Sequence, residues 1–158
     1  MQLSTIRIFH IISISMIILL SSCAEAKREI VVEKNCEICE QAQIDFKVRE
    51  LVISDKTYIH FTIGNKLNDG GNRSFTVHPP GTKKSFFIVD SDSGKRFNLL
   101  NVEGVPVFPQ TIELGPNESR DFNLTFEKLN SSSKKIHIIG GEPEEGQDVA
   151  QFMGIDLE

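Results

Sequence analysis

Two cysteines three positions apart, Cys36 and Cys39, are the residues of this chain best placed to do chemistry. A C-x-x-C pair can be a redox dithiol, half of a zinc site or a haem attachment site. Haem attachment requires a histidine directly after the second cysteine, where this chain has Glu40. Zinc would need two further ligands, and a thioredoxin-like dithiol needs a βαβ unit that the flanking sequence does not resemble. We expect a structural disulfide, with redox or metal-handling use of the pair as the alternative.

The segment Asp90-Ser-Asp-Ser-Gly94 has the acidic spacing of a calcium loop. An EF-hand would place Gly at its sixth position and Glu at its twelfth, whereas here Gly is fifth and the twelfth residue is Asn101. We therefore predict a hairpin turn in which Asp side chains accept hydrogen bonds from local amides.

The histidines after residue 50 are scattered, at positions 60, 78 and 137. No serine or cysteine lies in a nucleophile elbow of the form G-x-S-x-G. From these residues we predict no catalytic site, no metal site and no cofactor, and hence a protein that is not an enzyme.

A short apolar loop is the best candidate for binding a partner. It contains Val105, Val107 and Phe108, separated and followed by prolines. Apolar loop residues either cover one end of a β-domain or, if exposed, form the kind of patch that marks an interaction site. Both interpretations stay open from the sequence.

The N-terminus has the features of an export signal. Arg7 precedes a mostly apolar run from Ile8 to Leu20, too short for a comfortable transmembrane helix. The run ends in Leu20-Ser21-Ser22-Cys23, which resembles the lipobox of bacterial lipoproteins. That resemblance implies removal of residues 1–22 and lipidation of Cys23. An ordinary secretory signal is the alternative. In lipoproteins an Asp after the lipidated Cys retains the protein in the inner membrane, so Ala24 implies the outer membrane.

Charge argues against a nucleic-acid partner. Without residues 1–22 the chain keeps 16 basic and 22 acidic residues, a net charge of −6. Nucleic-acid binding calls for a basic face, which this balance does not favour.

The rest of the chain alternates between short apolar strands and turns. Alternation of period two predicts half-buried strands such as Ile44–Val48 and Ile59–Ile63. We expect Thr111–Phe126 to be a hairpin turning at Gly115–Glu118, with Phe122, Leu124 and Phe126 inward and Thr125 outward. A second hairpin is expected from Phe86 to Leu99. Further short strands are expected at 75–77, 136–139 and 152–157. This spacing favours an antiparallel all-β sandwich of about seven to nine strands.

The turn at Asp90–Gly94, the Gly115-Pro116 corner and the strand Phe122-x-Leu-x-Phe126-Glu127 resemble immunoglobulin-like domains of bacterial envelope lipoproteins. The resemblance implies a signal peptide over 1–22, a lipidated Cys, tether and C-x-x-C segment over 23–43, and an immunoglobulin-like sandwich over 44–158. The expected function is that of a lipid-anchored, non-catalytic cell-envelope protein. Its partners would be the membrane, through Cys23, and another envelope protein in an adhesion, assembly or scaffolding role. The alternative is a periplasmic redox or metal-handling protein that uses Cys36 and Cys39.

Overall fold

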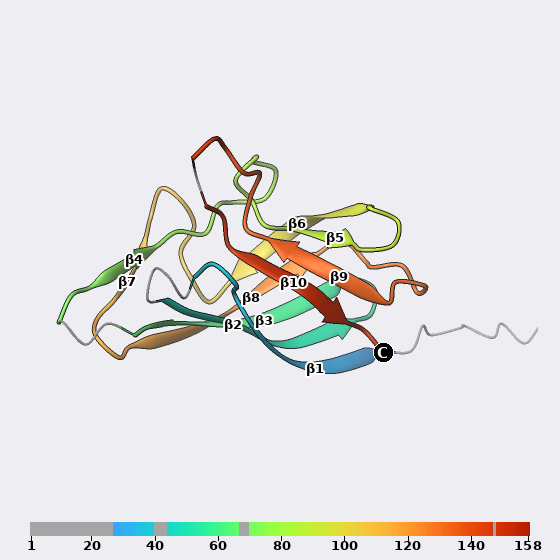
Figure 1. The fold of residues 1–158 in the computed structure, drawn as a ribbon, viewed down its shortest axis with the longest axis horizontal. Helices are drawn as coiled ribbons and strands as arrows, with labels where there is room; N and C mark the ends of the chain where they lie inside the picture. Colours follow the sequence, from blue (N-terminus) through green and yellow to red (C-terminus); the bar gives the residue numbers. More distant parts are fainter. Residues whose placement is uncertain (1–26, 40–43, 67–69, 147) are drawn as a thin grey trace, which may run out of the picture.

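The computed structural model describes residues 27–39, 44–66, 70–146 and 148–158, which form ten β-strands and no α-helix (Figure 1). Every pairing between named strands is antiparallel. The all-β antiparallel prediction is therefore confirmed. The signal sequence 1–22 and Cys23 lie outside the described residues.

One layer of the molecule is a long twisted sheet. In order across the sheet its strands are β1 (Arg28–Asn35), β2 (Ile44–Ile53), β3 (Thr57–Asn65), β8 (Ser119–Phe126) and the second half of β6 (Arg96–Glu103). The apolar rows predicted for β3 and β8 point into the core: Ile59, Phe61 and Ile63 have no exposed surface. Alternation along these strands thus predicted their buried face correctly.

The second layer faces the first and continues from the same strand β6. It contains the first half of β6, β5 (Phe87–Asp90), β9 (Lys135–Ile139) and β10 (Gln151–Asp156). Strand β6 pairs with β5 as far as Asn98 and with β8 from Leu99 onward, with a register shift between Leu99 and Asn101. Such an irregularity bends a strand and lets it pass from one sheet to the other.

The outer strands β1 and β10 approach each other on the opposite side of the core. Just beyond β1, the Glu37 amide donates a 3.0 Å hydrogen bond to the Gln151 carbonyl. The two layers are therefore joined along both sides, and the sandwich is close to a closed barrel. Closing a sheet in this way covers edge strands that would otherwise present unpaired backbone groups.

A separate two-stranded ribbon, β4 (Arg73–Phe75) with β7 (Ile112–Leu114), lies at one end of the sandwich (Figure 1). The predicted hairpin between 111 and 126 is therefore wrong in its pairing, although both strands exist. Strand β7 pairs with β4, and β8 inserts between β3 and β6. The Asn65 side chain ties the ribbon to the sandwich by donating to the Leu114 carbonyl at 3.0 Å.

Strand β1 lies in the segment 23–43 that was predicted to be mostly a tether with a short edge strand at Ile30–Val32, and it is longer than that strand. Residues 28–35 belong to the sheet and pair with β2, so the sandwich begins at residue 28 rather than 44. Along β1, Glu29, Val31 and Glu33 are exposed, whereas Val32 is buried in the core. Charged side chains on an outer strand face water, and for this reason the segment had the composition of a linker.

The two ends of the sandwich are distinct. At one end β1 begins, with Arg28 paired to Ile53 beside the turn between β2 and β3. At the other end lie the last residue of β3, Asn65, and the β4–β7 ribbon. In Figure 1 these ends are on the right and on the left respectively. A chain segment attached to β1 therefore enters the domain at the end opposite the ribbon.

Candidate functional site

The apolar loop 105–109 connects β6 to β7 and lies at the ribbon end of the sandwich. Its backbone is fixed to the segment after β4: the Phe108 amide donates to the Val77 carbonyl at 2.8 Å, and Val77 forms a parallel bridge with Val107. Val105 packs against the core, and Val107 is half-buried. Phe108 has 55% of its surface exposed. The three predicted residues thus divide into two that hold the loop and one that faces solvent.

The Phe108 side chain is positioned by His78. The two rings stack with their centroids 5.1 Å apart and their planes 25° apart. Burial of the imidazole, together with the nearby positive charge of Lys84, lowers the pKa of His78. The imidazole is therefore mostly neutral at pH 7 and packs against Phe108 as a flat ring. The exposed Phe108 ring, stacked on His78, therefore lies at the ribbon end of the molecule.

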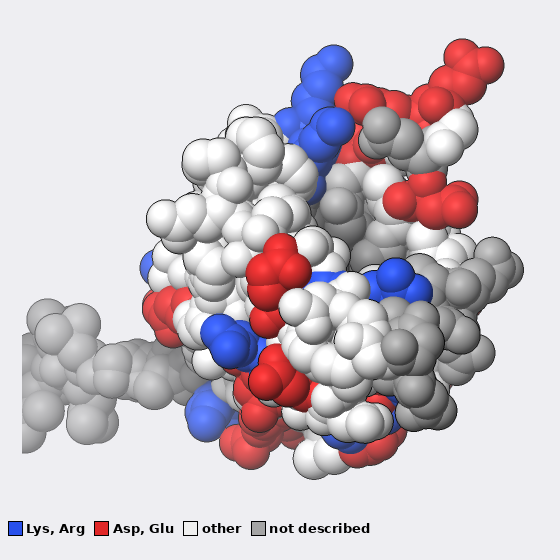
Figure 2. Space-filling view, turned by 90° about the vertical axis from the view of Figure 1, so that its left-hand side faces the viewer, with Lys and Arg blue, Asp and Glu red and all other residues white. Residues whose placement is uncertain are grey.

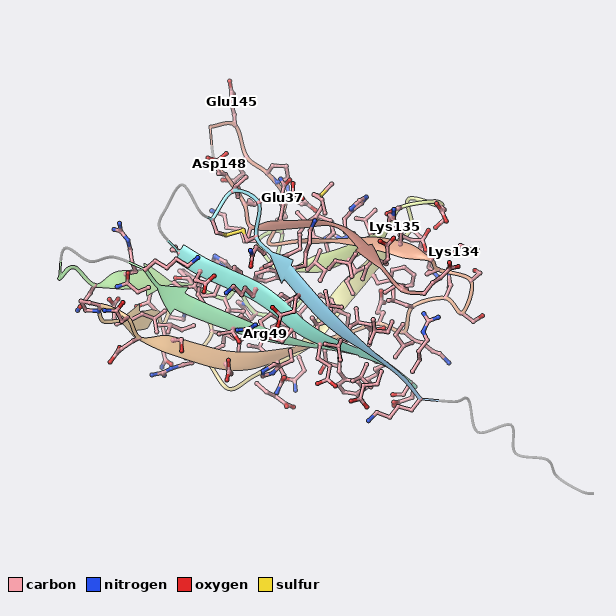
Figure 3. The ribbon with its side chains drawn as sticks, turned by 60° about the horizontal axis from the view of Figure 1, so that its bottom comes forward. Glu37, Arg49, Lys134, Lys135, Glu145 and Asp148 are labelled. Carbon is pink, nitrogen blue, oxygen red and sulfur yellow. A yellow bond between two sulfur atoms is a disulfide. The ribbon has the colours of Figure 1, made fainter. Side chains whose placement is uncertain are left out.

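Cys36 and Cys39 form a disulfide, as predicted, with their Cα atoms 5.3 Å apart. Cys36 is only 1% exposed and belongs to the hydrophobic core. Its amide donates to the Phe46 carbonyl at 2.8 Å. The disulfide therefore closes the turn that follows β1, next to the contact between that turn and β10 (Figure 3).

The Asp90–Gly94 segment is the predicted hairpin turn between β5 and β6. Asp90 is 4% exposed, and its Oδ1 accepts hydrogen bonds from the Asp92 amide and from the amide and hydroxyl of Ser93. The neighbouring Ser133 hydroxyl and the Ser93 donors lower the pKa of Asp90 to about 2. The carboxylate thus serves to order the turn.

The histidines are not brought together. His60 bonds Asn123 on β8, with Nδ1 and Oδ1 2.9 Å apart. His137 accepts from the Gly154 amide at its Nδ1 and contacts the Ser91 hydroxyl at its Nε2. Among the described residues, no three His, Cys, Asp or Glu side chains are placed to hold a metal ion.

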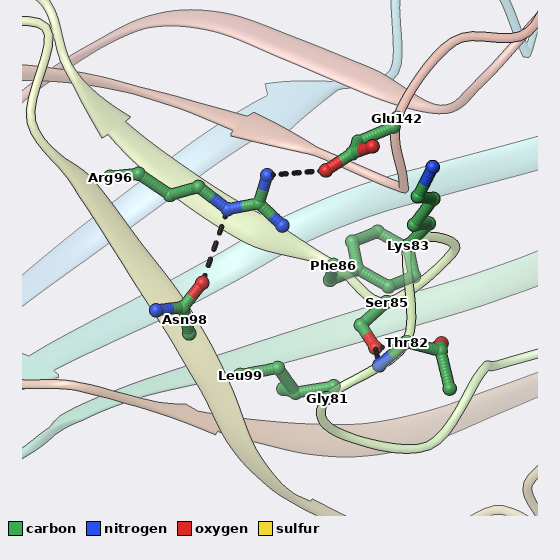
Figure 4. A pocket seen from close by; sticks show the side chains of 9 residues that line it. All are labelled: Gly81, Thr82, Lys83, Ser85, Phe86, Arg96, Asn98, Leu99 and Glu142. Atoms are coloured by element: carbon green, nitrogen blue, oxygen red, sulfur yellow. Dashed lines mark hydrogen bonds and ion pairs between the residues drawn. The ribbon is translucent and has the colours of Figure 1, made fainter.

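A pocket that the sequence did not reveal lies between the start of β6 and the loop before β5 (Figure 4). Its volume is about 360 Å³, and its lining comes from three segments of the chain: 81–86, 96–99 and Glu142. The Arg96 guanidinium crosses one wall. Its Nε donates to Asn98 Oδ1 at 3.1 Å, and its Nη1 to Glu142 Oε1 at 3.0 Å. Its Cζ lies 3.9 Å from the centre of the Phe87 ring, a cation–π contact.

The opposite wall is held against the segment after β9 by a close backbone approach. The Glu142 amide donates to the Lys83 carbonyl at 2.8 Å. Gly141 has a φ of +133°, and a Cβ at this position would lie 3.0 Å from the Lys84 carbonyl oxygen. Only glycine combines that φ with that approach. No sequence motif marks this pocket, because Glu142 is distant in the chain from the lining segments 81–86 and 96–99.

Charged side chains on the rest of the surface are dispersed. Figure 2 views the ribbon end, where acidic and basic residues are interspersed and an uncharged area lies to one side of them. Glu145 and Asp148 project from the loop between β9 and β10, whereas Lys134 and Lys135 lie at the far end of β9 (Figure 3). Glu144 and Glu145 in that loop are exposed, whereas Glu142 is half-buried and lines the pocket.

Comparison of the chain with protein-family models, with curated proteins and with solved structures found no match. Within the described residues there is no helix long and apolar enough to cross a membrane.

Proposed function

We propose that this chain is a lipid-anchored, non-catalytic protein of the bacterial cell envelope, with an immunoglobulin-like sandwich that binds another envelope component. Cys23 would carry the lipid, and the outer membrane would be its site. The loop containing Val105, Val107 and Phe108 would contact the partner. The observation that carries this proposal is the exposed ring of Phe108 in a loop at the end of the sandwich opposite the start of β1.

Anchoring at Cys23 would set the orientation of the domain. Cys23 is five residues before Arg28, so the two Cα atoms are at most about 18 Å apart in any conformation. The end of the sandwich where β1 begins would therefore lie close to the membrane. Strand β2 has ten residues, and at about 3.3 Å per residue it extends about 33 Å toward the other end. The Phe108 loop would then face away from the lipid.

The exposed ring of Phe108 fits a binding role. Aromatic residues are enriched in the centres of protein interfaces, where they bury large areas. Here the ring is held by His78, and its backbone by Val77, so binding would require little ordering of the loop.

Burial of Cys36 favours this proposal over a redox role for the cysteines. Exchange proceeds by attack of a thiolate on an accessible disulfide sulfur, and a reactive cysteine is partly exposed near a positive charge. Cys36 is 1% exposed and belongs to the hydrophobic core, and Cys39 is half-buried and packs against that core. This environment agrees better with a structural disulfide than with a redox-active one.

Site-specific photo-crosslinking in the native envelope tests the proposal. A benzophenone amino acid would replace Phe108 in one variant and Val31 in the other. Val31, 82% exposed on β1, is the matched control because it is an exposed apolar residue near the membrane-proximal end. We expect a discrete protein adduct from position 108 and none of the same mass from position 31. No adduct, or the same adduct from both positions, would contradict a binding role for the loop.

A further inference from the structure

We infer that the Arg96 pocket is a binding site for a small ligand bearing a single carboxylate group next to an apolar portion. This inference goes beyond the partner proposed for the Phe108 loop. It does not depend on the lipid anchor, because it is carried by a different set of residues: Arg96 and Asn98 on β6, Lys83, Phe86, Leu99 and Glu142.

Arg96 is held ready to bind an anion. A guanidinium has five N–H donors in a fixed plane. Two of them are used, by Asn98 and Glu142, and no hydrogen bond to Nη2 is found within the described part of the chain. Figure 4 shows Nη2 directed into the pocket between Phe86 and Asn98. The free Nη2 group can donate a charge-assisted hydrogen bond to a carboxylate oxygen of a ligand, and such a bond is stronger than one between neutral groups.

The Arg96 guanidinium is already oriented before a ligand binds, so binding requires little further loss of side-chain entropy. Phe87 supports its face, and the two hydrogen bonds fix its plane. Exposed arginines lose side-chain entropy when they bind a ligand, and a side chain already held in place loses less. Arg96 differs in this respect from an exposed arginine without fixed partners, whose side chain would have to be ordered when a ligand binds.

The charges around the pocket select a singly charged anion. Arg96 and Lys83 are basic, and Glu142 is acidic, which leaves one net positive charge among the charged lining residues. Lys83 stands at the rim and Glu142 at the upper wall (Figure 4). A doubly charged phosphate would bring its second charge close to the Glu142 carboxylate, and like charges at that range repel. A carboxylate leaves the charges balanced.

The rest of the lining fits the carbon portion of such a ligand. Phe86 and Leu99 form the apolar part of the pocket, and Gly81 adds no side chain to it. A pocket of about 360 Å³ is within the usual range for small-molecule sites, which combine apolar walls with a few fixed polar groups. The pocket is therefore suited to a compact organic acid or to the last residue of a peptide chain.

Titration of the full chain in detergent micelles, followed by ¹H–¹⁵N NMR, tests this site. The probes are N-acetyl-phenylalanine, its uncharged amide, and inorganic phosphate. We expect saturable shifts of the Gly81, Leu99 and Glu142 amides and of the Arg96 Nε–H with the carboxylate probe. The amide should bind at least about tenfold more weakly, because its uncharged end cannot accept a charge-assisted hydrogen bond from Arg96. Phosphate should also bind at least about tenfold more weakly, because its second charge would lie close to Glu142. Equal binding of the acid and its amide, or no saturable shift, would overturn the inference.

Arg96→Gln and Arg49→Gln form a matched pair of variants. Arg49 also makes an ion pair, to Glu33 at 2.9 Å, and its side chain is 36% exposed against 37% for Arg96. Arg96→Gln should weaken the carboxylate probe about tenfold or more, while Arg49→Gln should change it less than about twofold. Equal losses in both variants would overturn the assignment of the site.

A longer probe distinguishes the two sources of the carboxylate. Acetyl-Ala-Ala-Ala-Phe with a free C-terminus carries the same end group on a peptide chain. Binding equal to that of N-acetyl-phenylalanine would support a chain terminus as the ligand. Binding of the short acid alone would support a free organic acid.

Discussion

Phe46 on β2 and Phe152 on β10 pack edge to face across the sandwich, with ring centroids 5.0 Å apart and planes at 84°. The two strands belong to different layers, so this contact joins the sheets in the middle of the core. Phe46 also contacts the rings of four other phenylalanines, at positions 61, 75, 86 and 122. Aromatic pairs in this geometry contribute about 0.5–1.5 kcal/mol beyond the area that they bury.

Phe46→Ala should therefore lower the free energy of unfolding by about 3–5 kcal/mol, the usual cost of emptying a buried Phe site. Denaturant melts measure this loss. Tyr58→Ala is the control, because Tyr58 is also aromatic and on a neighbouring strand but 38% exposed. It should cost less than about 1 kcal/mol. Similar losses in the two variants would mean that Phe46 does not hold the layers together.

Asp90→Asn should destabilise the protein by about 1–2 kcal/mol at pH 7, allowing for partial solvent screening. The folded state holds the pKa of Asp90 at about 2, below its usual 3.8. The carboxylate therefore stabilises the fold above about pH 4, and this contribution is lost as the pH falls toward 2. Urea melts at pH 7 and between pH 4 and pH 2 should show the difference between wild type and variant shrinking.

Asp92→Asn is the control for that experiment, since Asp92 lies in the same turn but is exposed. We expect it to change the stability at pH 7 by less than about 0.5 kcal/mol. A stability difference between wild type and Asp90→Asn that does not change with pH would contradict the role of the ionised carboxylate.

Gly141→Ala should cost more than Gly94→Ala. Both glycines have positive φ, +133° and +69°, but only at position 141 would a Cβ meet backbone, 3.0 Å from the Lys84 carbonyl oxygen. Gly94→Ala should cost about 1 kcal/mol for the left-handed backbone alone. Gly141→Ala should cost about 2–4 kcal/mol and displace the 81–86 loop. Thermal melts measure the costs, and equal values would mean that the approach at Gly141 is not a constraint.

The double variant Cys36→Ala/Cys39→Ala should fold and lose no more than about 2 kcal/mol, because the loop that the disulfide closes is short. In the native wild type, burial of Cys36 should keep the bond from exchanging with millimolar glutathione, while it should be reduced readily in urea. Thiol counting measures both. Rapid exchange in the native state would favour the redox alternative.

The sequence predicted strands better than it predicted their partners. Period-two alternation depends only on which face is buried, so β3 and β8 were located correctly. It carries no information on which strand lies alongside, and β7 pairs with β4, which lies nearly 40 positions earlier in the chain, rather than with the adjacent β8. Thr125 was expected to face outward into solvent but is only 6% exposed. It lies on a central strand, directly between Tyr58 and Asn101, whose larger side chains flank it.

The candidate sites also differ in whether they could be predicted from the sequence. The disulfide and the 105–109 loop are local in sequence, and for this reason they could be singled out from the chain alone. The Arg96 pocket joins two segments, 81–86 and 96–99, to Glu142, which is 46 residues beyond Arg96 in the chain. Arg96 and Asn98 have the outward positions of an ordinary strand, and only the tertiary fold brings Glu142 to them.

Mass spectrometry of the N-terminal peptide from the membrane-extracted protein tests the proposed anchoring most directly. We expect a peptide that begins at Cys23, lacks residues 1–22 and carries at least two acyl chains. Two chains are expected because a single chain binds a membrane only marginally, at about 0.8 kcal/mol per buried CH₂. An unmodified Cys23, or an N-terminus at any other residue, would contradict the proposal that this protein is held at the membrane by a lipid.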